Sequence, residues 1–188
     1  GTITVKGITW EGENLTEGSV TLDGGTWTGA NSGIANIEGG KWTGTNAATT
    51  NLLAGEWTGV NTGTAIIKGG AWSSDNAGIV TFNGGSWTGN NVENGTVTVN
   101  ATGWDGNNAG AGSVELKADW SGNNTANGSV TLNGGTWSGN NTGESAIVSG
   151  TNGKWTGDNR GTITVKGITW EGNNLEGVTL SSGTWSGN

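Results

Sequence analysis

The sequence predicts an all-β fold: a single-stranded parallel β-solenoid (β-helix) of about 12 coils, each 15–18 residues long. Tryptophan recurs at intervals of 15 to 18 residues along the 188-residue chain. Glycine lies two residues after 11 of the 12 tryptophans, and asparagine lies four residues after every tryptophan that has such a position. Repeats of this length are too short for a pair of helices, which needs about 33 residues or more, and suit one coil of a solenoid.

The alternation of side chains along each strand of a coil predicts which of them face inward. Side chains two residues apart on a strand share a face, so the G-x-W-x-G-x-N pattern places glycine, tryptophan and asparagine together. We expect these glycines to leave room for the indole. The V-x-L segment before each pattern, as at Val20 and Leu22, is expected to form the inward face of an opposing strand. Each coil therefore contains two short strands.

Stacking of the coils predicts two inward ladders. Coils about 4.8 Å apart would stack their indoles in register, each pair contributing roughly 0.5–1.5 kcal/mol beyond burial. The asparagine amides would bond to one another or to turn backbone. The expected tryptophan ladder contains Trp10, Trp27, Trp42, Trp57, Trp72, Trp87, Trp104, Trp120, Trp137, Trp155, Trp170 and Trp185. The expected asparagine ladder contains Asn14, Asn31, Asn46, Asn61, Asn76, Asn91, Asn108, Asn124, Asn141, Asn159 and Asn174.

The sequence also contains a repeat that is longer than a single coil. Residues 1–12 (GTITVKGITWEG) recur unchanged at 161–172, a displacement of 160 residues. We therefore expect residues 1–188 to form one continuous array, a segment of a longer repeat protein made by duplication. A glycine-rich turn such as DGG or NGG is expected between the two strands of a coil. The segment VELKADW at 114–120 has no glycine there, so this coil is expected to be tighter or differently bent.

Composition argues against several classes of function. A net charge of −8 argues against nucleic acid as a partner, because phosphate binding needs a basic patch. No apolar run approaches the roughly 18 residues of a membrane span. The chain has no histidine or cysteine, one arginine (Arg160), and scattered acids without recurring pairs. We therefore expect no catalytic residues, no metal site and no cofactor.

The GG-x-W-[TS]-G-N-N run resembles the GG-x-[IVL] and F-x-x-N repeats of bacterial polymorphic outer-membrane proteins and other right-handed β-helix surface adhesins. Gly84–Gly85 with Trp87 and Asn90, and Gly134–Gly135 with Trp137 and Asn140, carry the match. It extends over the whole chain, with tryptophan in place of phenylalanine. The resemblance implies an extracellular or cell-surface, passenger-like β-helix.

Three functions are compatible with this pattern. The first is a non-enzymatic structural protein that forms a rigid rod, stalk or filament, adhesin-like, and assembles with itself end to end or laterally. The second is an ice-binding (antifreeze) solenoid, and the third a polysaccharide-binding surface, so carbohydrate or a cell surface is a further possible partner. Ice binding would use outward threonines of the V-x-L strand, namely Thr2, Thr4, Thr21, Thr96, Thr98, Thr131, Thr162 and Thr164. Residues such as Ile34, Ile79 and Glu115 interrupt these rows, so we expect ice binding to be absent or weak.

Overall fold

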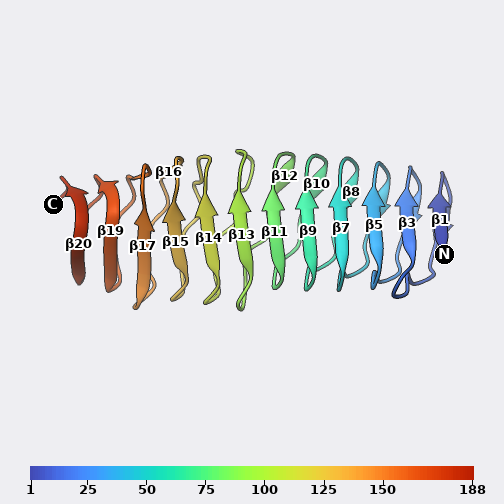
Figure 1. Cartoon of the computed structure of the whole chain (residues 1–188), viewed down its shortest axis with the longest axis horizontal. Helices are drawn as coiled ribbons and strands as arrows, with labels where there is room; N and C mark the ends of the chain where they lie inside the picture. Colours follow the sequence, from blue (N-terminus) through green and yellow to red (C-terminus); the bar gives the residue numbers. More distant parts are fainter. The chain divides into compact units, whose positions relative to one another are not determined.

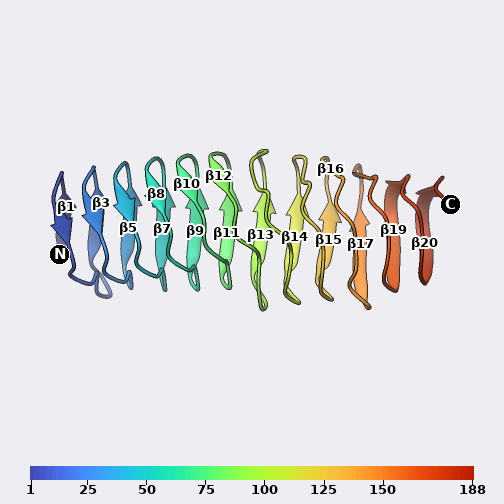
Figure 2. The ribbon, with the colours of Figure 1, turned by 180° about the vertical axis from the view of Figure 1, so that it is seen from behind.

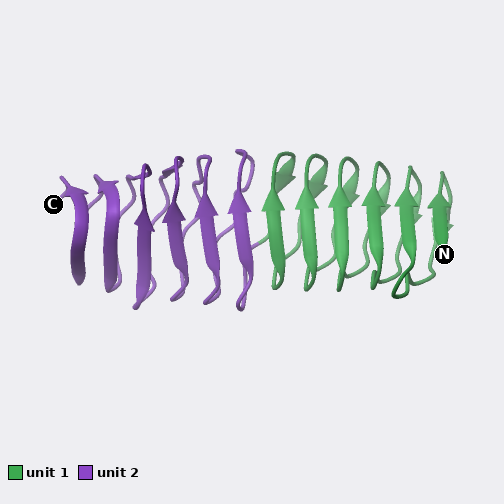
Figure 3. Ribbon diagram, in the orientation of Figure 1, with its two compact units in different colours: residues 1–89 green, residues 90–188 purple.

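The computed structural model describes all residues from Gly1 to Asn188 and contains strands and turns but no helix. The chain divides into two compact units, unit 1 (Gly1–Gly89) and unit 2 (Asn90–Asn188), coloured green and purple in Figure 3. Each unit is a parallel β-solenoid, and the two together contain about 12 coils. The predicted fold class is therefore confirmed.

Unit 1 alternates long and short strands along the chain (Figure 1). The long strands pair in parallel in chain order, and the short strands, each ending in tryptophan, pair in the same order in a second sheet. The long strands are β1 (Thr2–Val5), β3 (Ser19–Leu22), β5 (Ile34–Ile37), β7 (Thr49–Leu52), β9 (Thr64–Ile67) and β11 (Ile79–Phe82). The short strands are β2 (Thr9–Trp10), β4 (Thr26–Trp27), β6 (Lys41–Trp42), β8 (Glu56–Trp57), β10 (Ala71–Trp72) and β12 (Ser86–Trp87).

Unit 2 repeats this arrangement less regularly. Its long strands also pair in parallel in chain order, and Figure 2 shows from behind the segments that link one coil to the next. They are β13 (Thr96–Val99), β14 (Ser113–Leu116), β15 (Ser129–Leu132), β17 (Ala146–Gly150), β19 (Ile163–Trp170) and β20 (Val178–Trp185). The short strands β16 (Thr136–Trp137) and β18 (Lys154–Trp155) pair with each other, and β18 also pairs with the end of β19.

The predicted pair of strands per coil describes eight of the coils, and the other four, all in unit 2, differ. In β19 and β20 the two strands merge into one strand of eight residues. At Trp104 and Trp120 the short strand is reduced to a single bridging residue. Both of these tryptophans lack the glycine two residues earlier, where Thr102 and Ala118 stand instead. The 114–120 segment therefore departs from the regular coil in that its short strand is reduced to Trp120.

Alternating burial confirms the predicted parity of the long strands. In β3, Val20 and Leu22 are fully buried while Ser19 and Thr21 remain half-exposed. The same order of half-exposed and buried residues recurs in β7, β9, β14 and β15. β-Branched and aliphatic side chains suit such a pleated, half-buried surface. The inward residues of the long strands and the tryptophans form the core of each coil.

The tryptophans stack face to face in both units. Ring centroids of neighbours lie 4.5–5.3 Å apart from Trp10 to Trp87 in unit 1. The corresponding spacing is 4.6–5.5 Å from Trp104 to Trp185 in unit 2. Indoles also bond along the stack: Trp57 Nε1 donates to the Gly44 carbonyl at 3.0 Å, and the same bond recurs in coil after coil. The predicted ladder is confirmed, and the indole N–H groups from Trp27 to Trp87 and from Trp120 to Trp185 each have an acceptor in the preceding coil.

The two recurring glycine positions of the coil, both expected to leave room for the indole, have different roles in the structure. A Cβ on Gly44, two residues after Trp42, would lie 2.7 Å from the indole nitrogen and 1.9 Å from the Gly29 carbonyl oxygen. That glycine does leave room for the indole. Gly40, two residues before Trp42, is instead half-exposed in the turn, with a φ of 80° that disfavours other residues. The earlier glycine therefore turns the chain rather than making space beside the ring.

The asparagines form hydrogen-bonded ladders inside each unit. Asn46 Nδ2 donates to Asn61 Oδ1 at 2.7 Å and to the carbonyls of Ala48 and Thr64 at 3.0 Å. Side-chain bonds of 2.6–2.7 Å run in the same direction from Asn14 to Asn76. In unit 2 they measure 2.7–2.9 Å from Asn91 to Asn174. Both alternatives that the sequence left open, amide-to-amide and amide-to-backbone bonding, are therefore used.

Candidate functional site

The outward positions of the long strands in unit 1 carry no charged residue. Parallel pairing aligns these outward residues in two columns. One column is formed by the residue before the inward Val20 or its equivalent, and the other by the residue after it. The first column contains Thr2, Ser19, Ile34, Thr49, Thr64 and Ile79. The second contains Thr4, Thr21, Asn36, Asn51, Ile66 and Thr81.

The corresponding face of unit 2 carries charges. Its second column runs from Thr98 through Glu115, Thr131 and Ser149 to Lys166. Lys117 lies 3.7 Å from the Glu115 carboxylate, and Asn133 donates a hydrogen bond to it at 2.9 Å. The hydroxyl rows predicted for the whole array are therefore free of charge in unit 1 only.

Seven of the eight threonines predicted to form outward rows stand in these columns, namely Thr2, Thr4, Thr21, Thr96, Thr98, Thr131 and Thr164. The structure does not place Thr162 in either column. Because Ala146 pairs with Ile163, Thr164 is the outward residue beside Ile147, and Thr162 lies before β19 begins.

A hydroxyl column that the sequence analysis missed lies on the short-strand face of unit 1. It consists of the residue after each tryptophan, Thr28, Thr43, Thr58, Ser73 and Thr88, all exposed. The backbone N–H of each of these residues bonds to the tryptophan carbonyl of the preceding coil, so the column is in register. The column is hard to recognise in the sequence, because Lys41 and Glu56 interrupt the position before the tryptophans.

A second asparagine ladder, also missed, runs along unit 2 three residues after each tryptophan. Asn123 Oδ1 accepts the backbone N–H of Asn140 at 2.8 Å, and Asn140 Oδ1 accepts that of Asp158 at 2.8 Å. The ladder extends backwards through Asn107 to Asn90 and forwards to Asn173. The N-N dipeptides in the sequence of unit 2 indicate this ladder. Unit 1 lacks them, because it has Ala30, Thr45 and Val60 at the position before the inward asparagine.

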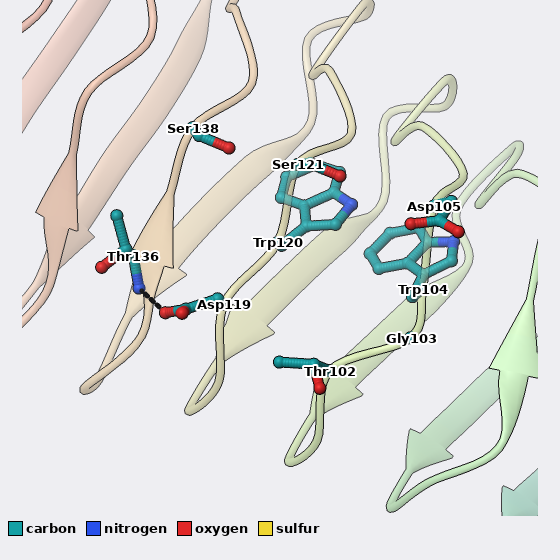
Figure 4. Close-up of a pocket in the computed structure, with 9 residues that line it drawn as sticks. All are labelled: Thr102, Gly103, Trp104, Asp105, Asp119, Trp120, Ser121, Thr136 and Ser138. Carbon is teal, nitrogen blue, oxygen red and sulfur yellow. Dashed lines mark hydrogen bonds between the residues drawn. The ribbon is translucent and has the colours of Figure 1, made fainter.

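One groove in unit 2, of about 270 Å³, brings two carboxylates near several hydroxyls. Figure 4 shows Asp105 and Asp119 on neighbouring coils, with the Asp119 carboxylate accepting the Thr136 N–H at 2.8 Å. The groove is also lined by Thr102, Gly103, Ser121 and Ser138. Trp104 and Trp120 contribute to its wall but are each only 2% exposed, so their ring faces are not accessible for stacking on a sugar.

The charged side chains are dispersed over the outside of both units. Lys6 forms an ion pair with Asp23 at 2.9 Å, and the hydrogen bond and attraction to that carboxylate raise the pKa of Lys6. No three acidic side chains lie close enough together to hold a metal ion. No helix that could cross a membrane is present.

Comparison with known proteins gives no family assignment. The chain matches no protein-family description, no curated protein and no solved structure.

Proposed function

We propose that the chain is a non-enzymatic, extracellular structural repeat protein whose stacked coils form a rigid rod, stalk or filament. One observation carries this proposal. The large side chains of each coil and its ladder asparagine are buried in bonds and contacts to the neighbouring coils, as the stacked Trp42 and Trp57 and the bonded Asn46 and Asn61 illustrate. A chain that uses its largest side chains and its buried amides for stacking gains stiffness along the stack.

The surface chemistry supports the same proposal. Nucleophilic or acid–base catalysis needs paired groups with perturbed pKa values. Here no three acidic side chains lie together, and of the two carboxylates in the groove, Asp119 is already engaged by the Thr136 backbone. The predicted location outside the cell and the adhesin-like role rest on the resemblance of the G-G-x-W-x-G-N-N runs to surface repeats.

Electron microscopy of the purified chain tests the structural role. We expect stiff particles with one dominant width. Small-angle scattering in solution should give a cross-section of one coil and no flexible-chain behaviour at high angle. Globular or flexible particles would contradict the proposal.

A second candidate, ice binding, is favoured by one specific observation. The twelve outward positions of the long strands in unit 1 hold threonine, serine, isoleucine and asparagine and no charged residue. An uncharged array of hydroxyls and methyls is a surface that can order water. Isoleucines and asparagines interrupt the threonines, however, so this function ranks second. Thermal hysteresis measurements test it.

A further inference from the structure

The chain contains six tripeptides of the form N-x-[ST], the acceptor sequence for attachment of a sugar to asparagine. In a chain so rich in asparagine, the tripeptide alone carries little information. The structure separates the six, because a sugar needs a side-chain amide that is exposed and that the fold does not use. The tripeptides begin at Asn14, Asn94, Asn100, Asn123, Asn127 and Asn140.

Four of these asparagines are buried, half-buried or already engaged in the fold. Asn14 is 4% exposed, and its Nδ2 donates to Asn31 Oδ1 at 2.6 Å inside the coil. Asn123 and Asn140 are half-buried in the second ladder of unit 2, where each accepts a backbone N–H of the next coil at 2.8 Å. Asn100 is exposed in the turn after β13 but takes part in an interaction within the fold. A sugar on any of these four would compete with existing contacts.

Asn94 and Asn127 differ, because both are exposed and neither uses its side-chain nitrogen. Each lies two residues before a long strand of unit 2, at the tail of the β13 or β15 arrow in Figure 1. The Asn94 side chain makes no hydrogen bond. The Asn127 side chain uses only Oδ1, which accepts the backbone N–H groups of Glu144 and Ser145 at 2.9 and 3.2 Å. The Nδ2 atom that a sugar would occupy is therefore free in both residues.

The two turns lie on the same edge of unit 2 with room between them. The turn that holds Asn94 is closed by its neighbours, since the Gly95 N–H donates to the Val92 carbonyl at 2.9 Å. In strand register, the coil between the two turns places Ala111 at the corresponding exposed position. The acceptor side chains of Asn94 and Asn127 therefore stand two coils apart, about 10 Å, with only a methyl group between them.

We propose that Asn94 and Asn127 are sites of N-linked glycosylation on this turn edge. The inference rests on the proposed extracellular role, because the donor, an oligosaccharide carried on a lipid diphosphate, meets chains that are being exported. In the transfer, asparagine Nδ2 forms a bond to C1 of the sugar and loses a proton. The bond from C1 to the diphosphate oxygen breaks, and the lipid diphosphate leaves. The sugars would cover the turn edge and leave the outward strand faces of unit 2 open.

Mass spectrometry of the full chain secreted from a eukaryotic host tests the proposal. Peptide:N-glycosidase treatment in heavy-oxygen water converts each glycosylated asparagine to a labelled aspartate. We expect the label at Asn94 and Asn127 of the folded chain and none at Asn14. Absence of sugar from Asn94 or from Asn127 overturns that site. Equal occupancy at Asn14 would show that burial does not select the sites, and would overturn the inference as a whole.

Hydroxyl substitutions give matched variants that leave every asparagine in place. Thr96→Ala and Ser129→Ala should each remove the mass of one sugar chain, and Thr96→Ser should retain it, because serine also completes the acceptor tripeptide. Thr16→Ala, which removes the exposed hydroxyl of the tripeptide at Asn14, is the control and should leave the mass of the sugar unchanged. A chain secreted without sugar leaves the structural role intact, whereas flexible particles of the sugar-free chain in electron microscopy would reject that role whatever the sugar content.

Discussion

Trp42 and Trp57 lie parallel, with ring centroids 4.8 Å apart and planes 9° apart, and both indole nitrogens donate to glycine carbonyls of the preceding coil. Each ring is therefore buried on both faces and satisfied at its edge. This relationship, repeated along each unit, lets a chain with 40 glycines and few aliphatic residues assemble a core.

Replacing one ring in the middle of a stack should be costly. Trp57→Ala removes a fully buried indole between Trp42 and Trp72, and we expect it to lower the free energy of unfolding by about 3–5 kcal/mol. Chemical denaturation measures the loss. Thr58→Ala, next in sequence but exposed, should change stability by less than about 0.5 kcal/mol. Similar values for the two variants would argue against an inward ladder.

The glycine after each tryptophan should tolerate no side chain. In Gly44→Ala the new Cβ would collide with the Gly29 carbonyl oxygen, a backbone atom that cannot move aside without breaking coil pairing. We expect a loss of about 3 kcal/mol, at the upper end for overpacking. In Gly39→Ala the nearest atom would be 3.5 Å away, so that variant should be nearly neutral. Thermal unfolding of the two variants decides the point, and a neutral Gly44→Ala would contradict the structure.

The sequence predicted the two ladders because their signal repeats in every coil. The spacing of the tryptophans predicted the number of coils, and the alternation of side chains along each strand placed Trp42 and Asn46 inside the coil. Two features could not be obtained in this way. That Gly40 serves the turn and does not also make space beside the indole depends on its φ value, which the sequence does not reveal. The place of Thr162 depends on the register of β17 against β19, which the neighbouring coil determines, since the identical Thr2 does pair in a column.

The buried hydroxyl of Thr50 identifies a site where the core can be improved. Its Oγ1 is buried without a hydrogen-bond partner, in the inward column between Ala35 and Ala65. Thr50→Val keeps the shape and removes the unsatisfied group, so we expect about 1 kcal/mol of stabilisation. Thr49→Val, on the outer face, should be close to neutral. Calorimetry compares the two, and a destabilised Thr50→Val would imply that the hydroxyl has a bonding partner such as a buried water.

Ice binding should be absent or weak. The uncharged face of unit 1 has hydroxyls in both columns only at β1 and β3, and Ile34, Asn36, Asn51, Ile66 and Ile79 break the rows beyond. Strong thermal hysteresis that is abolished by Thr49→Tyr would overturn the ranking of ice binding below the structural role. Thr58→Tyr tests the hydroxyl column of the short-strand face, and a loss of hysteresis in that variant alone would assign ice binding to that column instead.

A charge placed in the asparagine ladder should make stability depend on pH. Asn61 is fully buried, accepts from Asn46 Nδ2 and donates to Asn76 Oδ1, both at 2.7 Å. In Asn61→Asp the ionised carboxylate loses its solvation and faces the Asn76 oxygen, so burial and repulsion raise its folded-state pKa above the unfolded value of about 3.9. A protonated carboxyl can instead donate to Asn76.

The sign of the effect follows from that raised pKa. The folded variant binds its proton more tightly than the unfolded chain, so its stability relative to the parent is greatest at acid pH. It is lost as the pH rises through the folded-state pKa. Asn36→Asp is the matched control, because the Asn36 oxygen accepts a hydrogen bond from Asn51 on the partly exposed outer face and a carboxylate can do the same. Unfolding of both variants from pH 3 to pH 8, measured against the parent chain, should show a steep relative loss for Asn61→Asp alone. A parallel pH profile for the two variants would mean that the ladder amides are not buried.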